Sequence, residues 1–519
     1  MRKRGREDVC AYAYAGERGA VDDRHRVGVD HDFVVVANRL PVAVAELPDG
    51  CVEWRRSPGG LVSALEPVVR RTDGVWVGWP GTADIAPDPW DTAGMHLVGV
   101  PLSVDEVEQF YEGFCNATLW PLYHDVIAPP VFDPRWWKTY VRVNDRFAAC
   151  VDCSAAPGAT VWVHDYQLQL VPDLLRLRRP DLRIGFFDHI PFPGYEIFAQ
   201  LPWRRQVVRG LLGADLIGFQ RRADAANFLR ACRRAASLKT TGPTVLLPAN
   251  RPEEYENQVG PSEDHADATG GDAGRRVRVG CFPISIDWAA WVDLAGRPDV
   301  QARAREIRSE LGDPQIILLG MDRLDYTKGI LHRLRAYEAL LDAGLVGPPK
   351  SVFVQVASPS RDHVNQYQQL LQDVEALVGR INGEYATLSQ PAVRYLHHSY
   401  PREEIAALYL AADVMLVTSL RDGMNLVAKE YVCCRHREDG ALLLSEFTGA
   451  ADEMGSAFLV NPHDIQGVKD AIMQAAQLNP AEAGRRMRSL RKQVHDHDVT
   501  RWADAFLGCL RIAHPHLGR

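Results

Sequence analysis

The chain has 519 residues, of which 46% are hydrophobic, and a formal net charge of −8 at pH 7. This length and composition predict two or three domains with substantial cores. The negative charge argues against a nucleic-acid-binding protein, which would carry a basic stripe. No apolar run reaches the roughly 18 residues of a membrane helix, and no apolar segment follows the basic N-terminus. Ten cysteines without a regular spacing are typical of reduced thiols, so we expect a cytoplasmic protein.

The first predicted strand and helix follow a charged, aperiodic stretch, residues 1–31, which we expect to be a disordered extension. Residues 33–37 predict a buried strand that leads to Arg39. A helix is expected over residues 61–71, directly after Gly60. Paired glycines between a strand and a helix can place backbone N–H groups against a phosphate, although most such pairs are plain turns. The pattern is not GxGxxG, which argues against a NAD-dependent oxidoreductase.

Two further predicted strands deliver polar side chains to one edge of the same sheet. Residues 160–164 precede Asp165, and residues 184–187 precede Asp188 and His189. The carboxyl ends of parallel strands meet at one edge, so we expect Asp165 and His189 to lie close together. A single histidine beside a strand is more often structural, but two groups capable of acid–base chemistry at neighbouring strand ends are also a candidate site.

The rest of the chain repeats the alternation of strands and helices. Residues 242–275 are dominated by Pro, Glu, Asp and Gly, and we expect a flexible excursion there. A strand over residues 277–283 resumes the first domain, whose boundary we place near residues 285–287. Strands and helices then alternate again from residue 315. Two such sets predict an α/β protein with two Rossmann-like domains that face each other across a cleft. The last helices, at residues 464–477 and 481–513, are expected at the back.

A tight polar turn follows the predicted strand at residues 413–418 and precedes a buried helix that starts at residue 426. In open α/β sheets, ligands bind at such strand ends. Gly423 in the turn lets the backbone approach a ligand, and the first N–H groups of the helix face an anion or a polarised oxygen. Glu430, about two helical turns beyond Gly423, is either a surface residue or an acceptor for two adjacent hydroxyls, as on a ribose.

The sequence Arg-Asp-Gly-Met-Asn-Leu-Val-Ala-Lys-Glu-Tyr at residues 421–431 resembles the donor-sugar motif of the trehalose-6-phosphate synthases, which are retaining family 20 glucosyltransferases of GT-B fold. Asn-Arg at 38–39, Gly-Gly-Leu at 59–61, His-Asp-Tyr at 164–166 and His-Ile-Pro-Phe-Pro at 189–193 match the same family. The resemblance covers roughly residues 33–510. It implies glucose transfer with retention from UDP-, ADP- or GDP-glucose to glucose 6-phosphate. No Asp-x-Asp-Gly-Thr motif is present, so we expect no phosphatase domain.

The resemblance also implies a role for each matching residue. The nucleotide-glucose donor would be held by Gly60, Trp79, His189, Arg323, Lys328, Asp422, Gly423, Met424, Asn425, Leu426, Val427 and Glu430. The acceptor would be held by Arg39, Tyr111, Trp120, Asp165 and Arg361. The residues expected to be catalytic are Asp165, His189, Arg323, Lys328 and Asp422.

The leaving diphosphate must be neutralised as the glycosidic bond breaks. Some glycosyltransferases use a metal on Asp-x-Asp, and residues 30–32 and 496–498 fit that pattern but lie outside the predicted cleft. Arg323 offers a planar fork and Lys328 a point charge, both directly after a buried strand. We therefore expect these two cations to do the work of a metal, with no metal and no other cofactor required.

The resemblance implies a division of the chain into an extension (1–31), an acceptor domain (32–285), a donor domain (286–480) and a C-terminal helix (481–519) that crosses back to the first domain. A homo-oligomer, either a dimer or a tetramer, is compatible with it. Two residues depart from the family pattern: Asp188 stands where an apolar residue is expected, and Gln167 where some members have His.

These departures leave two alternatives open. One is a relative on the same fold with another phosphorylated acceptor, such as a cyclitol phosphate. The other is a non-catalytic sugar-phosphate sensor. Intact Arg323, Lys328, Asp422 and Glu430 argue against the sensor, because a sensor need not keep the leaving-group site.

Overall fold

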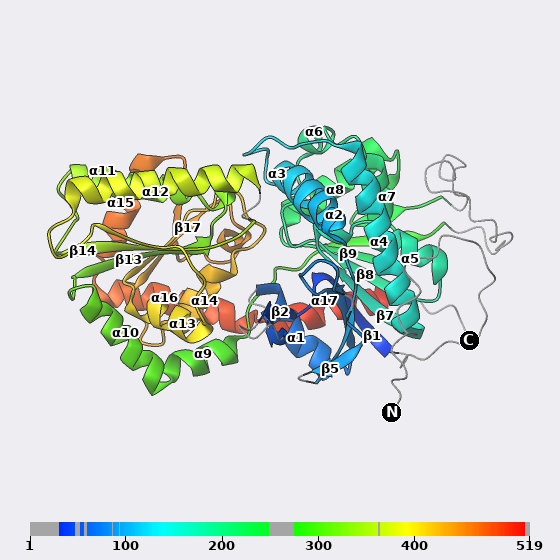
Figure 1. The fold of residues 1–519 in the computed structure, drawn as a ribbon, viewed down its shortest axis with the longest axis horizontal. Helices are drawn as coiled ribbons and strands as arrows, with labels where there is room; N and C mark the ends of the chain where they lie inside the picture. Colours follow the sequence, from blue (N-terminus) through cyan, green and yellow to red (C-terminus); the bar gives the residue numbers. More distant parts are fainter. Residues whose placement is uncertain are drawn as a thin grey trace, which may run out of the picture.

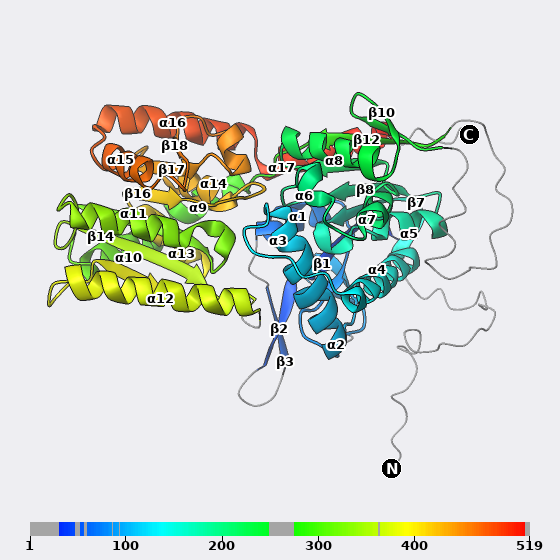
Figure 2. The ribbon, with the colours of Figure 1, turned by 90° about the horizontal axis from the view of Figure 1, so that it is seen from above.

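The computed structural model describes residues 31–46, 52–56, 60–85, 87–92, 94–248, 274–361 and 364–513. Two α/β halves lie side by side, each built around its own sheet (Figures 1 and 2). The expected disordered extension, except for His31, and residues 249–273 of the expected excursion lie outside the described residues. Within the described ranges, no helix is long and apolar enough to cross a membrane.

The first half is built on a ten-stranded sheet in the order β10-β11-β12-β9-β8-β7-β1-β4-β6-β5, whose central strands, from β12 to β6, are parallel. The strands are β1 (His31–Arg39), β4 (Val75–Trp79), β5 (Trp90–Thr92), β6 (Met95–Gly99), β7 (Ala155–His164), β8 (Arg183–Phe187), β9 (Leu216–Phe219), β10 (Lys239–Thr241), β11 (Thr244–Leu246) and β12 (Arg276–Cys281). A separate hairpin pairs β2 (Val42–Glu46) with β3 (Val52–Arg56).

Helices cover both faces of this sheet (Figure 2). They are α1 (Gly60–Arg71), α2 (Val104–Glu106), the π-helix η2 (Val107–Leu119), α3 (Trp120–Tyr123), α4 (Pro134–Ser154), η3 (Tyr166–Leu168), α5 (Val171–Arg178), α6 (Tyr195–Phe198), α7 (Arg204–Leu211) and α8 (Arg222–Ala235). The aromatic-rich segment after residue 107 thus forms a π-helix, which is rare over more than a single turn and has no simple sequence signature.

The second half is built on a six-stranded, wholly parallel sheet in the order β15-β14-β13-β16-β17-β18. Its strands are β13 (Ile316–Arg323), β14 (Ser351–Ser358), β15 (Val393–Leu396), β16 (Val414–Val417), β17 (Ala441–Ser445) and β18 (Phe458–Val460). Its helices are α9 (Trp288–Gly296), α10 (Pro298–Glu310), η5 (Tyr326–Lys328), α11 (Ile330–Asp342), α12 (Asn365–Tyr385), α13 (Arg402–Ala411), α14 (Leu426–Cys434), η6 (Gly449–Asp452), α15 (Ile465–Ala476) and α16 (Pro480–Asp496). The expected α/β architecture with two Rossmann-like halves is confirmed.

The final helix, α17 (Val499–Ala513), joins the two halves because it leaves the second half and packs on strands β8 and β9 of the first. In Figure 1 it lies in red beneath the first sheet. Phe506 stacks on Trp162 of β7 with ring centroids 4.8 Å apart. Added Cβ atoms on Gly185 and Gly218 would come within 2.7 and 2.8 Å of Phe506, so glycine permits this close packing.

Two expectations about local structure are wrong. Residues 481–513 do not form one continuous segment of helix, because α16 ends at Asp496 and Asp498 begins α17 by accepting from the backbone N–H of Arg501 at 3.0 Å. Only α17 therefore crosses to the first half. The excursion does not begin at residue 242, because β11 pairs antiparallel with β12 and buries Val245 beside Val277.

Candidate active site

A fully buried carboxylate, Asp325, follows β13 where the two halves meet and gathers cations around it. Its Oδ1 accepts from the backbone N–H and the hydroxyl of Thr327, both at 2.9 Å. Its Oδ2 lies 3.4 Å from Arg361 Nη1 and 4.0 Å from Arg323 Nη2. Burial acts to raise the pKa of Asp325, but Arg361, Arg323 and Lys328 outweigh it and lower that pKa to about 2. Asp325 is therefore ionised at neutral pH and holds both guanidinium groups.

Lys328 and Asp422 form a second charged pair, which links the ends of the neighbouring strands β13 and β16. Lys328 Nζ donates to Asp422 Oδ2 at 2.6 Å. Ser419 Oγ and Asn425 Nδ2 donate to the same oxygen, each at 3.2 Å. Burial acts to raise the pKa of Asp422, but Lys328 and Asn425 outweigh it, so the pKa is lowered. The Asp422 carboxylate is therefore ionised beside Lys328 Nζ.

The turn between β16 and α14 touches the first half directly. A Cβ on Gly423 would lie 2.2 Å from the carbonyl oxygen of His189, so no other residue fits there. Asn425, in the left-handed region at φ 81°, caps α14 by accepting from the backbone N–H three residues on at 3.1 Å. A Cβ on Gly60 would lie 2.7 Å from Leu426 Cδ1, so α1 also meets this turn. The predicted donor turn is thus enclosed by both halves.

The first half contributes Asp165 and His189 from neighbouring strand ends, as the sequence predicted. Asp165 Oδ1 accepts from the backbone N–H groups of Tyr166 at 3.1 Å and His189 at 3.3 Å, and burial raises the pKa of Asp165 to about 6. His189 Nε2 lies 3.0 Å from His164 Nδ1, and its Nδ1 lies 3.4 Å from Gln220 Nε2. Burial lowers the pKa of His189 to about 3, so the ring is neutral. Both ring nitrogens have protein partners.

Aromatic side chains of the first half pack against the cations of the second. The guanidinium carbon of Arg361 lies 3.8 Å from the ring centroid of Trp120, and that of Arg323 lies 5.6 Å away. Arg361 Nη2 also donates to Tyr166 Oη at 3.3 Å. These cation–π contacts cross between the halves, so the two guanidinium groups and Trp120 form one wall.

Arg39 lies on the same side of the site, at the end of β1. Its guanidinium carbon is 4.7 Å from the ring centroid of Trp79, and Trp79 is in turn 5.5 Å from the ring of Tyr111 on the π-helix. The phenol of Tyr111 interacts electrostatically with both Arg39 and Arg361. The structure therefore gathers the predicted acceptor residues Arg39, Tyr111, Trp120 and Arg361 around one polar region.

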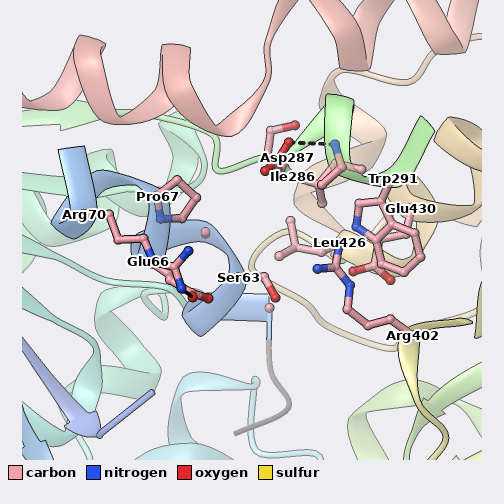
Figure 3. Close-up of a pocket in the computed structure, with 14 residues that line it drawn as sticks. Ser63, Glu66, Pro67, Arg70, Ile286, Asp287, Trp291, Arg402, Leu426 and Glu430 are labelled. Atoms are coloured by element: carbon pink, nitrogen blue, oxygen red, sulfur yellow. Dashed lines mark hydrogen bonds and ion pairs between the residues drawn. The ribbon is translucent and has the colours of Figure 1, made fainter. Parts of the chain in front are cut away.

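A cavity of about 550 Å³ opens between α1 of the first half and helices α9, α13 and α14 of the second (Figure 3). Glu430 lines it and accepts from the hydroxyl of Tyr409 at 3.0 Å, while burial raises the pKa of Glu430 to about 7. Arg402 lies over the ring of Trp291 at 4.7 Å, close to Glu430. Leu426, the first residue of α14, also lines the cavity, so the cavity adjoins the predicted donor turn at residues 419–425.

The other predicted residues have mainly packing roles in this structure. Met424 is buried and its carbonyl accepts from the N–H of Ala450 at 2.9 Å, and Val427 packs on the core between the halves. Reasoning from the sequence missed a set of residues that hold the predicted ones in place: Asp325, Tyr166, His164, Gln220, Tyr367, Trp291 and Arg402. Of these, Asp325 could have been identified from the sequence, because it lies between Arg323 and Lys328 directly after a buried strand.

Asp188 is fully buried beside His189. Neither of its carboxylate oxygens has a hydrogen-bond partner among the described residues. Burial, with the nearby charges of Asp165 and Asp224, raises the pKa of Asp188. The buried carboxylate is therefore expected to hold a proton.

Two Rossmann-like halves, with fixed cations and a glycine-containing turn at the strand ends between them, define a glycosyltransferase of the GT-B fold. The model of glycosyltransferase family 20 matches residues 31–511. The chain therefore belongs to glycosyltransferase family 20, the family of the trehalose-6-phosphate synthases.

Relatives extend over nearly the whole chain. The trehalose-6-phosphate synthase of Mycobacterium sp. (strain KMS) is 55% identical over 481 residues, which cover 93% of this chain and 95% of the relative. A UDP-forming α,α-trehalose-phosphate synthase from Burkholderia xenovorans, solved in complex with glucose-6-phosphate, is 32% identical with a TM-score of 0.79 and covers 92% of this chain and 99% of its own. A structure from E. coli bound with UDP-2-fluoro glucose is 31% identical with a TM-score of 0.80, covering 92% and 98%.

Replacing Asp188 with Leu is expected to stabilise the protein, and more so at higher pH. The folded state binds the Asp188 proton more tightly than the unfolded state does, so the free energy of unfolding falls as pH rises above the unfolded pKa of about 4. Asp188→Leu removes this loss, with an expected gain of about 1–4 kcal/mol near pH 8 and a smaller gain near pH 5. Denaturant unfolding at both pH values measures it, with exposed Asp88→Asn as the control. Equal destabilisation at both pH values would contradict this assignment.

Proposed function

We propose that this protein transfers glucose, with retention, from a nucleotide-glucose to glucose 6-phosphate, and so forms trehalose 6-phosphate and a nucleoside diphosphate. The observation that carries the proposal is the convergence of Arg323, Lys328 and Arg361 around buried Asp325, opposite Trp120 of the first half. Three cations in a region enclosed by both halves suit two phosphorylated substrates. The ligands named for the two solved relatives, a UDP-glucose analogue and glucose-6-phosphate, support the same pair of substrates.

Arg323 and Lys328 are assigned to the diphosphate of the donor. Arg323 is about half exposed and can receive phosphate oxygens directly, whereas Lys328 would exchange its partner Asp422 for them. Fixed cations there stabilise the charge that develops as the bond to the anomeric carbon breaks. Asp422, released from Lys328, would accept from a hydroxyl of the donor glucose, and His189 would exchange a protein partner for another hydroxyl. Gly60 and the turn from Gly423 to Val427 would enclose the sugar and its phosphates.

The cavity that contains Glu430 is assigned to the nucleoside. At neutral pH the Glu430 carboxyl, with a pKa of about 7, accepts from Tyr409 and has a second oxygen for a ribose diol. The volume of about 550 Å³ is sufficient for a nucleoside. The UDP-forming relatives favour uridine, and a comparison of UDP-, ADP- and GDP-glucose as donors tests the base.

The acceptor is assigned to the region between Arg39, Tyr111, Trp120 and Arg361. Its 6-phosphate would lie between the two guanidinium groups, and Asp165 would accept from a hydroxyl of the sugar ring. For the chemical step we propose front-face attack. The acceptor oxygen bonds to the anomeric carbon as the bond to the leaving phosphate breaks, and that phosphate oxygen takes the acceptor proton. In this scheme Asp422 accepts from a hydroxyl of the donor glucose and is not assigned the role of a covalent nucleophile.

Two alternatives differ in what they predict for substrates. A relative that uses a cyclitol phosphate would need the same phosphate contacts but different contacts to the ring. A sensor would bind sugar phosphate without releasing a nucleoside diphosphate. Assaying nucleotide release with glucose 6-phosphate, glucose and a cyclitol phosphate distinguishes the three functions.

Arg361→Ala is expected to weaken binding of the acceptor. A charge-assisted hydrogen bond to phosphate contributes about 1.5–3 kcal/mol, so KM for glucose 6-phosphate should rise roughly 10- to 150-fold. Initial rates with varied acceptor measure this, and Arg380→Ala, which removes an exposed arginine of α12, is the matched control. The wild type should use free glucose very poorly. Comparable turnover on glucose and glucose 6-phosphate would refute the phosphate site.

Lys328→Ala is expected to lower kcat/KM for the donor without any dependence on metal. Leaving a buried charge uncompensated costs about 3–5 kcal/mol, which is roughly a hundred- to several-thousand-fold in rate. Arg323→Lys should also lose most activity, because an ammonium cannot reproduce the guanidinium fork. Lys350→Ala, on an exposed loop, is the control.

The same kinetics in excess EDTA test the role of a metal. Within the described ranges, no group of three His, Cys, Asp or Glu side chains is placed to hold an ion. Wild-type activity that is abolished by EDTA and restored by Mg²⁺ would overturn the assignment of Arg323 and Lys328 to the leaving group.

A further inference from the structure

Arg421, in the donor turn next to Asp422, reaches across to the first half. Its Nε lies 3.2 Å from Asp125 Oδ2, in the loop after α3. Its Nη2 donates to Asp224 Oδ1 at 3.5 Å, in the first turn of α8. The Arg421 side chain is only 16% exposed. One guanidinium group therefore bridges two acidic residues from different elements of the opposite half.

Asp224 depends on this bridge. It is fully buried, and its Oδ2 has no hydrogen-bond partner among the described residues. Burial raises the pKa of Asp224 to about 7, and Arg421 followed by Arg221 oppose that rise. An ionised carboxylate is costly to bury without a cation, so Asp224 favours the arrangement in which Arg421 is docked.

The two residues that follow Arg421 connect its docking to the rest of the site. Asp422 is paired with Lys328 of the second half, and its backbone N–H donates to the carbonyl of Phe447 at 3.2 Å. Gly423 lies against the carbonyl of His189 in the first half. Asp422 and His189 are both assigned to the donor glucose, so the docking of Arg421 acts on a turn that carries part of the donor site.

A second bridge between the halves offers a comparison. Arg221, just before α8, donates to both oxygens of Asp452 in η6, at 2.8 and 2.7 Å. This bridge joins the same two halves and is shorter, but its link to the donor turn is indirect, through η6, where the N–H of Ala450 donates to the carbonyl of Met424 at 2.9 Å. The two bridges therefore allow a direct contact of the turn to be compared with an indirect one.

We propose that Arg421, docked on Asp125 and Asp224, is a positioning residue that sets Asp422 and the donor glucose at reacting distance from the acceptor. The inference rests on the proposed glucosyl transfer. A displacement of about 1 Å at a reacting centre costs up to about 100-fold in rate, so the bridge acts mainly on kcat. Ground-state binding of the nucleotide involves Arg323, Lys328 and Glu430 and is expected to be retained.

The test compares wild type with Arg421→Gln, Asp224→Asn, the double variant, Asp125→Asn and Arg221→Gln. Measured are kcat and KM for UDP-glucose and glucose 6-phosphate, UDP affinity by calorimetry, the melting temperature, and the radius of gyration by small-angle scattering. Asp125 is 43% exposed, so Asp125→Asn keeps the interior intact and tests the bridge in a folded protein.

Arg421→Gln is expected to lower kcat about 10- to 100-fold, with UDP affinity and both KM values within about threefold of wild type. Asp125→Asn should lower kcat by a smaller factor. The double variant should be no worse than Arg421→Gln, because both changes break one interaction. Arg221→Gln should enlarge the radius of gyration at least as much as Arg421→Gln, yet lower kcat by a clearly smaller factor than Arg421→Gln does.

Three results would overturn the inference: an unchanged kcat in Arg421→Gln, an equal loss of kcat in Arg221→Gln, or additive losses in the double variant. Failure of the proposed function is distinguishable from these. It would show in the wild type, which would then release no UDP from UDP-glucose and glucose 6-phosphate.

Discussion

The buried carboxylate of Asp325 is the interaction on which the site depends. Arg323, Lys328 and Arg361 carry like charges into one region at the end of β13, and their mutual repulsion would spread them apart without a compensating anion. Asp325 accepts from the backbone N–H and the hydroxyl of Thr327, so hydrogen bonds from a neutral residue hold it in place in addition to the cations. Its lowered pKa shows that the cations more than offset the cost of its burial. Under the proposed function, phosphorylated substrates would therefore meet cations that are already in place.

The second constraint is that neither half holds a complete site. Trp120, Tyr111 and Asp165 come from the first half, whereas Arg361, Lys328 and Asp422 come from the second. The halves are joined by α17, whose Phe506 stacks on Trp162, and by contacts at the donor turn, where Gly423 meets the carbonyl of His189. A shift between the halves would separate these side chains, so the packing of α17 and the charged bridges matter to the geometry of the site as well as to stability.

Much of this arrangement could be predicted from the sequence, and the remainder has physical reasons. The sequence predicted that Asp165, His189, Lys328 and Asp422 lie at strand ends. Apolar runs followed by polar residues mark the carboxyl edge of a parallel sheet. The pairing of His189 with His164 could not be predicted, since it depends on side-chain rotamers across neighbouring strands. The surroundings of Glu430 could not be predicted, because Arg402 and Trp291 come from separate helices and share no sequence motif. The polar composition of residues 242–275 led us to expect a flexible excursion, so β11 was not predicted. The break between α16 and α17 at residues 497–498 was not predicted either.

The most direct test of the central claim is the steady-state kinetics of Asp325→Asn, with donor and acceptor varied independently. The amide keeps the shape of the side chain but removes the charge that holds Arg323 and Arg361. The account predicts a folded protein whose kcat/KM falls at least about 100-fold for both substrates, because both phosphate sites lose their anchor. A folded variant that retains kcat/KM within about threefold for either substrate would contradict the claim that Asp325 organises the site.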